Sequence, residues 1–304
     1  MTWLTEPDAA HAGDRLRMLL TRSGCLAMPG AHNGMAALQA RDAGFQALYL
    51  SGAAMTAAMG LPDLGIITVD EVCFYIRQVA RAGLPVLVDA DTGYGEALNV
   101  MTTVRAFENA GAAALHIEDQ LLPKKCGHLN DKKLADPRDM AAKISAAARA
   151  RRHAMIFART DAAASEGFDA AVARARLYLD AGADAIFPEA LVTAEMFRAF
   201  AAAMPGVPLL ANMTEFGRTP FFTQAEFADM GYSLVIWPVS SLRVANKAQA
   251  ELYAAIARDG GTHGQIERMQ TRSELYAAID YVGYEALDAS IVASVVPEAL
   301  PQRS

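Results

Sequence analysis

The sequence predicts an α/β protein built as a closed (β/α)8 barrel of the TIM type, with extra helices at its C-terminal end. Three observations support this prediction. Eight short apolar runs alternate with stretches of helical spacing, glycines precede several of these runs, and polar residues follow them. The chain of 304 residues is 53% hydrophobic, which suits one barrel of roughly 250 residues plus an extension. We therefore expect a single domain over residues 1–304, in which residues 246–304 form a C-terminal helical extension.

The expected strands are short, apolar and rich in branched side chains. They cover residues 25–28, 47–50, 86–88, 114–117, 154–158, 185–187, 208–211 and 234–237. A helix is expected over residues 8–23, and others between the strands. Strands that alternate with helices imply parallel βαβ units, and eight such units close a barrel. A doubly wound open sheet is the alternative.

A weak internal repeat supports the barrel further. Gly44, Gly111, Gly182 and Gly231 each follow a helical stretch and precede a strand within a few residues. Glycine suits the left-handed position just beyond a helix end. We therefore expect four of the helices to end at these glycines.

Polar residues stand where the predicted strands end. They are Ser51, Asp89, Asp91, Glu118, Asp119, Arg159, Asp161, Glu189, Asn212, Thr214 and Ser240. Catalytic groups of (β/α)8 barrels lie at the C-terminal ends of the strands. The sequence therefore predicts a polar bowl at one end of the barrel.

Asp89 and Asp91 follow a fully apolar strand and precede a glycine-punctuated loop. Side chains two residues apart on a strand point to the same side. Two carboxylates on one side repel each other unless they share a proton or bind a hard cation such as Mg²⁺. The pair therefore indicates a Mg²⁺ site, with a solvated acidic loop as the alternative.

The loop after the fourth predicted strand contains Cys126 beside Lys124 and Lys125, two residues before His128. Neighbouring positive charges lower the pKa of a thiol, which favours a reactive cysteine; an ordinary basic surface loop is the alternative. Cys25 and Cys73 lie in apolar surroundings and are expected in the core.

Three arginines and one histidine are further residues whose roles the sequence indicates. Arg159, Arg243 and Arg272 follow strands or lie near the C-terminus, and an arginine fork binds carboxylates in two-point contacts. Together they suggest a substrate with several carboxylates, although each alone could be a structural ion-pair partner. His116 lies inside a predicted strand and is expected in the core.

Composition limits the possible partners. A net charge of −7 without a basic block argues against nucleic acid, and no apolar run approaches the roughly 20 residues that span a bilayer. The N-terminal residues lack the basic region and following apolar stretch of a signal peptide. Three widely spaced cysteines suggest reduced thiols. We therefore expect a cytoplasmic protein.

Several motifs together resemble the isocitrate lyase and phosphoenolpyruvate mutase superfamily, and within it the bacterial 2-methylisocitrate lyases. The motifs lie at residues 49–52, 60–65, 87–91, 116–119, 124–128, 158–161, 187–189, 210–217 and 269–276, and cover nearly the whole chain. The Lys-Lys-Cys-Gly-His segment at 124–128 is the most specific for a lyase, since the mutases lack its Cys-Gly-His element.

The resemblance implies cleavage of 2-methylisocitrate to pyruvate and succinate, dependent on Mg²⁺ with Mn²⁺ possible, in propionate breakdown. It also implies a homotetramer with C-terminal helices exchanged between subunits. Asp89 and Asp91 resemble the metal-site carboxylates, with Asp63 and Glu118 around the water shell of the metal. Cys126 would be the general acid, its pKa set by Lys124, Lys125 and His128. Tyr49 is our candidate for the base that takes the hydroxyl proton. The residues that match substrate contacts are Ser51, Gly52, Ala53, Gly127, Arg159, Glu189, Asn212, Met213, Thr214, Arg243 and Arg272.

Two departures from the family pattern bear on the substrate. Ala53 stands where these lyases often have glycine, and it still leaves room for a methyl group. Leu129 removes a possible carboxylate contact. Isocitrate is disfavoured, because isocitrate lyases carry a bulky tryptophan at the position of Ala53 and have much longer chains. The alternatives are a lyase or hydrolase acting on 2,3-dimethylmalate or oxaloacetate, then a phosphonate mutase, and a silent dicarboxylate-binding barrel.

Overall fold

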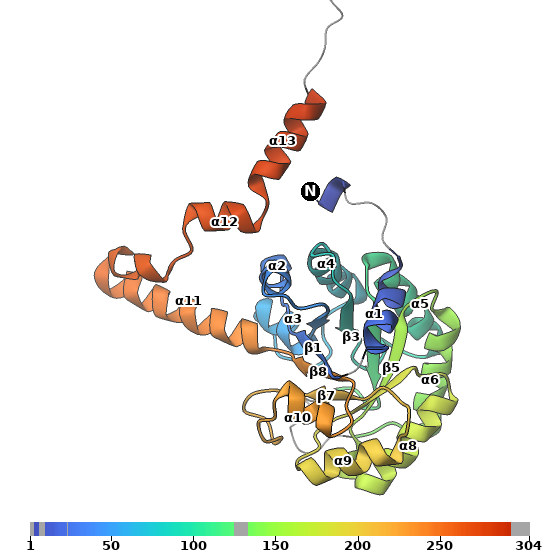
Figure 1. The fold of residues 1–304 in the computed structure, drawn as a ribbon. Coiled ribbons are helices and arrows are strands. Elements are labelled where there is room, and N and C mark those ends of the chain that lie inside the picture. The colour runs from blue at the N-terminus through green and yellow to red at the C-terminus, as the bar shows by residue number, and fades with distance from the viewer. Residues whose placement is uncertain (1–2, 6–9, 23, 125–132, 293–304) are drawn as a thin grey trace, which may run out of the picture.

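Eight parallel strands surrounded by helices form the body of the protein (Figure 1). The computed structural model describes residues 3–5, 10–22, 24–124 and 133–292. The strands are β1 (Leu26–Pro29), β2 (Leu48–Leu50), β3 (Val86–Asp89), β4 (Ala114–Glu118), β5 (Met155–Thr160), β6 (Ala185–Pro188), β7 (Leu210–Asn212) and β8 (Leu234–Trp237). Each coincides with a predicted strand to within two residues at either end, so the predicted order of strands is confirmed.

The strands close into a ring. Strands β2 to β6 pair in sequence order, and β1 pairs with β8, which pairs with β7. Single parallel bridges, Gly30 with Tyr49 and Ile186 with Leu209, join these two groups. An open doubly wound sheet would leave two edge strands unpaired, so that alternative is wrong and the barrel is confirmed.

Helices follow the strands and cover the outside of the barrel (Figure 1). They are α1 (Ala12–Leu20), α2 (Gly34–Asp42), α3 (Gly52–Ala58), α4 (Val69–Ala80), α5 (Ala97–Ala110), α6 (Pro137–Ala150), α7 (Ala162–Ser165), α8 (Phe168–Asp180), α9 (Ala194–Ala203), α10 (Gln224–Asp229), α11 (Ser240–Asp259), α12 (Arg272–Ala278) and α13 (Tyr281–Val292), with short 3₁₀ helices η1 (Trp3–Thr5) and η2 (His263–Arg268). Helix α1 lies within the predicted range 8–23.

The four repeat glycines have the conformation that the sequence predicts. Gly44, Gly111, Gly182 and Gly231 have φ values of 93°, 111°, 110° and 91°. Side chains with a Cβ atom rarely adopt such values. The glycines therefore allow the chain to turn from the end of a helix into the next strand.

Alternating side chains of the strands divide the core into two parts. Val86 and Val88 of β3 face the outer helices, whereas Leu87 packs inside the barrel with Phe157 and Leu210. This is the layered packing that fills a barrel of eight strands. The inner layer is the floor on which the polar bowl rests.

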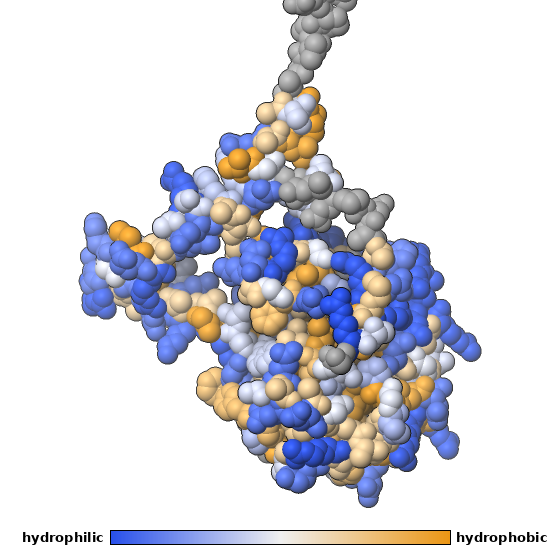
Figure 2. Space-filling model, viewed as in Figure 1, coloured by the Kyte–Doolittle hydropathy of each residue, from blue (hydrophilic) through white to orange (hydrophobic). Residues whose placement is uncertain are grey.

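The C-terminal helices extend away from the barrel (Figure 1). Helix α11 has 20 residues, a length of about 30 Å at the α-helical rise. Helix α13 presents apolar side chains to solvent, with Val282 and Ile291 71% and 72% exposed, and Figure 2 shows orange patches on this arm. Exchange of these helices between subunits stays a prediction. Among the described helices, none has both the length and the apolar character needed to cross a membrane.

Candidate active site

The strand register brings the predicted polar residues together. Inward-facing core residues Leu87, Phe157, Phe187 and Leu210 are followed two positions later by Asp89, Arg159, Glu189 and Asn212. Because side chains on a strand alternate with a period of two, the later residues point to the same interior. The polar bowl therefore lies directly above the inner core, at the C-terminal ends of the strands.

Asp89 and Asp91 meet beside Gly52, the first residue of α3. Oδ2 of Asp89 accepts a hydrogen bond from the Gly52 backbone N at 3.1 Å, and its Oδ1 accepts one from the Asp91 N at 3.0 Å. A Cβ atom on Gly52 would lie 3.0 Å from Asp89 Oδ2 and 3.3 Å from Asp91 Oδ1. The two carboxylates therefore face one narrow space that only glycine leaves open.

Lys124 supplies a positive charge to this acidic cluster. Its Nζ forms an ion pair with Asp63 Oδ1 at 2.7 Å and another with Asp91 Oδ1. The side chain is only 3% exposed. Burial lowers the pKa of a lysine, but the surrounding carboxylates, first Asp89 and then Glu118, raise the pKa of Lys124 above its ordinary value. Lys124 is therefore a buried ammonium, which corrects the alternative of an ordinary surface loop at this residue.

The two aspartates differ in their acid strength. Burial raises the pKa of Asp91 to about 7, with a further contribution from the charge of Asp89. Burial acts in the same direction on Asp89, but the positively charged groups around it lower its pKa to about 2. The pair therefore holds at least one negative charge at neutral pH, as two carboxylates that share a site do.

The acid pair fits a hard divalent cation. Mg²⁺ in proteins is often held by one or two carboxylates and otherwise by water and substrate. Among the described residues no three acidic, histidine or cysteine side chains form a ready-made metal cluster. Asp89 and Asp91 are the candidates for direct ligands because they face the same space beside Gly52. Within the same described part, Oε1 of Glu118 is buried without a hydrogen-bond partner. That oxygen suits a bound water, and the roles of Asp63 and Glu118 around the metal stay predictions.

Arg159, at the end of β5, carries the second buried positive charge of the bowl. Its guanidinium donates to Asp161 from Nε at 2.9 Å and from Nη2 at 3.2 Å. It also forms an ion pair with Glu118 at 3.1 Å and lies 3.8 Å from Glu189. The two-point contact with Asp161 occupies Nε and Nη2 and fixes the plane of the guanidinium.

A buried network behind β5 holds this arginine in place. Asp119, which is fully buried, accepts hydrogen bonds from Thr160 Oγ1 at 2.8 Å and from the Asp161 backbone N at 2.9 Å. It also accepts bonds from Tyr178 at 2.9 Å and Arg174 at 3.3 Å. The sequence marked Asp119 only as a polar residue at a strand end; its supporting role depends on contacts between distant segments.

Tyr49 lies on the floor of the bowl beside His116. Its hydroxyl is 2.8 Å from Nε2 of His116, whose ring is fully buried. Burial, with the charge of Asp89, raises the pKa of Tyr49 well above 10, and burial lowers the pKa of His116 to about 4. Both groups are neutral near pH 7. In this environment the Tyr49 hydroxyl can donate a hydrogen bond, and its role as the base that takes the hydroxyl proton stays a prediction. The core position predicted for His116 is confirmed.

The remaining polar residues reach the bowl from β7 and β8. Asn212 Nδ2 lies 3.3 Å from Oε2 of Glu189. Arg243 donates from Nη1 to Glu215 Oε2 at 2.9 Å and to the Glu215 carbonyl oxygen at 2.8 Å. Arg243 is partly exposed, so it can present its guanidinium to the mouth of the bowl.

These groups surround a cavity of about 100 Å³. Its lining consists of Tyr49, Ser51, Ala53, Asp63, Asp89, Glu118, Lys124, Arg159, Phe187, Glu189, Asn212, Thr214, Pro238, Val239 and Arg243. Most of the predicted site residues are therefore brought together. Phe187, Pro238 and Val239 are lining residues that the sequence reasoning missed, and only their place at strand ends could have indicated them.

Some predicted residues do not line the cavity. Gly52 and Asp91 border it through the contacts given above, but the side chain of Met213 packs in the core. Arg272 begins α12, is exposed and lies beyond α11, so its predicted substrate contact is not made within this chain. Cys126, Gly127 and His128 lie outside the described residues. Cys25 and Cys73 are buried as predicted.

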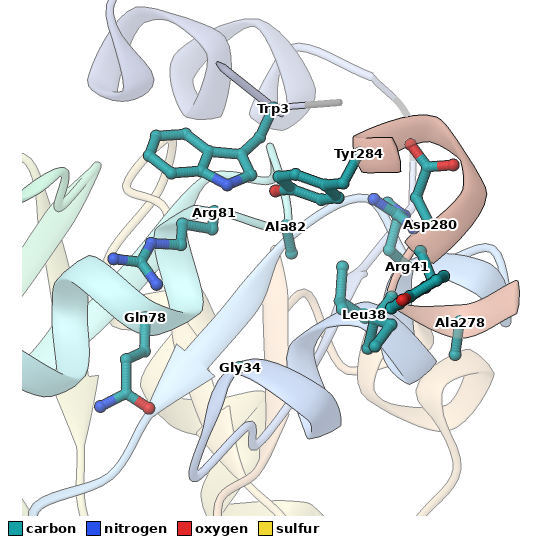
Figure 3. A pocket seen from close by; sticks show the side chains of 12 residues that line it. Trp3, Gly34, Leu38, Arg41, Gln78, Arg81, Ala82, Ala278, Asp280 and Tyr284 are labelled. Atoms are coloured by element: carbon teal, nitrogen blue, oxygen red, sulfur yellow. The ribbon is translucent and has the colours of Figure 1, made fainter. Parts of the chain in front are cut away.

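A larger cavity of about 580 Å³ lies between η1, α2, α4 and the junction of α12 with α13 (Figure 3). Trp3, Arg41, Arg81, Asp280 and Tyr284 are among its lining residues. It contains none of the predicted site residues and no strand end. The smaller cavity at the strand ends is therefore the candidate active site.

Comparison with known proteins shows the family of the chain. A family model described as phosphoenolpyruvate phosphomutase matches residues 16–257. The chain is 50% identical over 301 residues to a 2-methylisocitrate lyase of Bacillus subtilis, covering 98% of this chain and all of the relative. It is also 50% identical, with the same coverage, to a 2-methylisocitrate lyase of Halalkalibacterium halodurans.

A solved structure leads to the same family. The crystal structure of 2,3-dimethylmalate lyase, described as a PEP mutase/isocitrate lyase superfamily member, superposes with a TM-score of 0.89 at 34% identity, over 97% of this chain and all of that one. With a family match over most of its length and relatives of half-identical sequence, this chain belongs to the phosphoenolpyruvate mutase and isocitrate lyase superfamily.

Proposed function

We propose that this chain is a lyase that cleaves 2-methylisocitrate to pyruvate and succinate, in the methylcitrate route of propionate breakdown. The observation that carries the proposal is the joint placement of the acid pair, Arg159 and Asn212 around one cavity. The 50% identity to 2-methylisocitrate lyases over almost the whole chain supports the choice of substrate.

Two arginines of the cavity suit a substrate with several carboxylates. Arg159 and Arg243 both line the cavity, and guanidinium groups bind carboxylates in two-point contacts. Ser51, Gly52 and Ala53 would hold the pyruvate part, and Asn212 and Thr214 would donate hydrogen bonds to the remaining carboxylates. Ala53 adds no more than a methyl group, so the substrate methyl has room.

Asp89 and Asp91 would hold Mg²⁺, or Mn²⁺ in its place, and the metal would supply Lewis-acid polarisation of the oxygen that becomes the carbonyl of pyruvate. The bond that breaks joins the hydroxyl-bearing carbon to its neighbour in the succinate part. As the hydroxyl loses its proton, its oxygen forms the carbonyl, and the electron pair of the broken bond passes to the succinate carbon. Cys126, as general acid, gives its proton to that carbon.

Glu118 is a better acceptor for the hydroxyl proton than Tyr49. Burial raises the pKa of Glu118 well above its ordinary value, although Arg159 opposes this. Glu118 also lines the cavity, and its Oε1 is buried without a hydrogen-bond partner among the described residues. A positioned carboxylate with a free acceptor oxygen can serve as a general base. We therefore propose Glu118 as the general base that accepts the substrate hydroxyl proton, directly or through one water.

A panel of substrates tests the proposal. Purified protein with Mg²⁺ is given 2-methylisocitrate, 2,3-dimethylmalate, oxaloacetate or phosphonopyruvate, and pyruvate, succinate and the other products are quantified. Equal amounts of pyruvate and succinate from 2-methylisocitrate, at a kcat/KM well above those for the other three, are expected. Preferential turnover of 2,3-dimethylmalate or oxaloacetate would instead support the corresponding alternative.

The proposal extends to assembly and location. We infer a homotetramer in which the C-terminal helices are exchanged between subunits, and the exposed apolar side chains of α13 support such an association. We place the protein in the cytoplasm. Light scattering at several concentrations tests the assembly, and a monomer at all of them would refute it.

A further inference from the structure

Lys124 competes for an oxygen that a metal ion would need. Its Nζ is ion-paired with Asp91 Oδ1, the same atom that faces the space beside Gly52. A magnesium ion bound to a carboxylate oxygen lies about 2.1 Å from it. An ammonium in direct contact with that oxygen and a divalent cation bound to it would repel each other strongly. The two cations therefore exclude each other at Asp91.

Asp63 offers the ammonium a second place. The distance from Nζ to Asp63 Oδ1 is 2.7 Å, and the side chain of Asp63 is more exposed than that of Asp91. The lysine stem is flexible and unbranched. It passes Gly65, where a Cβ atom would lie 3.5 Å from Cγ of Lys124. Asp63 can therefore keep the ammonium after Asp91 has released it.

The other buried cation that lines the cavity, Arg159, cannot take over this task. Arg159 is bound to Asp161 and Glu118 and lies close to Glu189. Of the described cations, Lys124 alone is in ion-pair contact with Asp63 and Asp91. Among the described residues, Asp63 and Asp91 thus depend on one lysine for a direct ion-pair partner.

We propose that Lys124 is a resident counter-cation of the metal site, which pairs with Asp91 before a divalent cation binds and is retained by Asp63 once that cation has bound. Asp63 is then the acceptor for the displaced lysine and not itself a metal ligand. The inference rests on the metal site of the proposed function and adds a mechanism that sets its affinity.

Mn²⁺ binding tests the inference without any turnover. The dissociation constant of Mn²⁺ is measured from the electron paramagnetic resonance signal of the free ion, for the wild type, Lys124→Gln, Asp63→Asn and the double variant. Lys124→Gln should lower the constant about tenfold, because the competing charge is gone. With Lys124 present, Asp63→Asn should raise the dissociation constant of Mn²⁺ about tenfold, because the lysine then has only Asp91 as a partner. In the Lys124→Gln background, Asp63→Asn should change the dissociation constant of Mn²⁺ by less than about threefold. The double-mutant cycle would then show strong coupling between Lys124 and Asp63.

A matched control separates this effect from general attraction. Lys143 donates from Nζ to the Thr92 carbonyl oxygen at 3.3 Å, so Lys143→Gln removes an equal charge near the same loop; its constant should stay within about threefold of the wild type. The inference would be overturned if Asp63→Asn changed the dissociation constant of Mn²⁺ equally in the wild-type and Lys124→Gln backgrounds. It would also be overturned if Lys143→Gln strengthened Mn²⁺ binding as much as Lys124→Gln does. So would the absence of Mn²⁺ binding in every variant. If a lysine variant is unstable, Lys124→Met and the shift in melting temperature by Mn²⁺ give the same comparison. Because catalysis is not measured, failure of the substrate assignment leaves this result unaffected.

Discussion

The carboxylate of Asp119 binds the backbone N of Asp161 at 2.9 Å, and Asp161 in turn binds both Nε and Nη2 of Arg159. The orientation of the guanidinium in the cavity thus depends on a fully buried carboxylate behind β5. This relationship connects the stability of the barrel to substrate binding, because one residue contributes to both.

Asp119→Asn should leave the guanidinium of Arg159 less firmly oriented. The amide keeps one acceptor oxygen, so one of the bonds to Thr160 and Asp161 is lost, at a cost of roughly 1–3 kcal/mol in unfolding free energy. We expect KM for 2-methylisocitrate to rise about tenfold with a smaller change in kcat, since ground-state binding is affected first. Steady-state kinetics and urea unfolding measure both.

Tyr178→Phe is the matched control for Asp119→Asn. It removes the bond from Tyr178 to Asp119 and leaves the bonds to Thr160 and Asp161 in place. A stability loss of about 1 kcal/mol without a change in KM is expected. If KM rose equally in both variants, the effect would be a general loosening and not the position of Arg159.

Glu118→Gln should slow the reaction at the step that removes the hydroxyl proton. Loss of a general base lowers the rate by about 10²–10⁴-fold, so kcat should fall by that factor while binding of pyruvate persists. Mn²⁺ affinity is measured beside kcat. Unchanged kcat would refute the assignment of the base, and a loss of Mn²⁺ affinity that accounts for the whole effect would assign Glu118 to the metal instead.

Gly52→Ala should interfere with the acid pair. The added Cβ would lie 3.0 Å from Asp89 Oδ2, so the carboxylate must shift, and we expect Mn²⁺ to bind about tenfold more weakly, which is about 1.4 kcal/mol. Gly34→Ala is the control, because its Cβ would have no contact shorter than 3.5 Å. Equal Mn²⁺ affinity in the wild type and both variants would contradict the position of the metal beside Gly52.

The three cysteines should differ in reactivity with iodoacetamide. Burial raises the pKa of the Cys25 thiol to about 12, so only about one molecule in ten thousand carries its thiolate at pH 8. The pKa of Cys73 is also raised by burial. The thiolate is the reactive form, so peptide mass spectrometry at pH 8 should find Cys126 modified first, and all three modified after unfolding. Labelling of Cys25 as fast as Cys126 in the folded protein would contradict the interpretation.

The sequence could predict the strands and the polar bowl because both depend on local patterns. A strand that alternates every two residues places Asp89 above Leu87 and Arg159 above Phe157, whatever surrounds them. Closure of the ring could not be decided in the same way. An open sheet and a barrel share this periodicity, and the bridge between Gly30 and Tyr49 depends on strand tilt and register.

Contacts between distant segments account for the rest. Lys124, adjacent to Lys125, is also typical of a basic surface loop, and it is buried only because carboxylates from other segments offset the cost of removing its charge from water. Arg272 was predicted from its residue type near the C-terminus and from the resemblance, but it begins α12, beyond α11, and does not line the cavity. The position of Tyr49 was predicted, but its raised pKa depends on its burial.

The most direct test of the account is the fate of the proton on the succinate carbon. Cleavage of 2-methylisocitrate in D₂O should give one pyruvate per succinate, with a single deuterium on each succinate and none on freshly formed pyruvate, because only the succinate carbon receives the electron pair and is protonated. Cys126→Ser should lose most of this turnover while still binding pyruvate with Mg²⁺. Succinate without deuterium, no cleavage by the wild type, or full activity of Cys126→Ser would contradict the account.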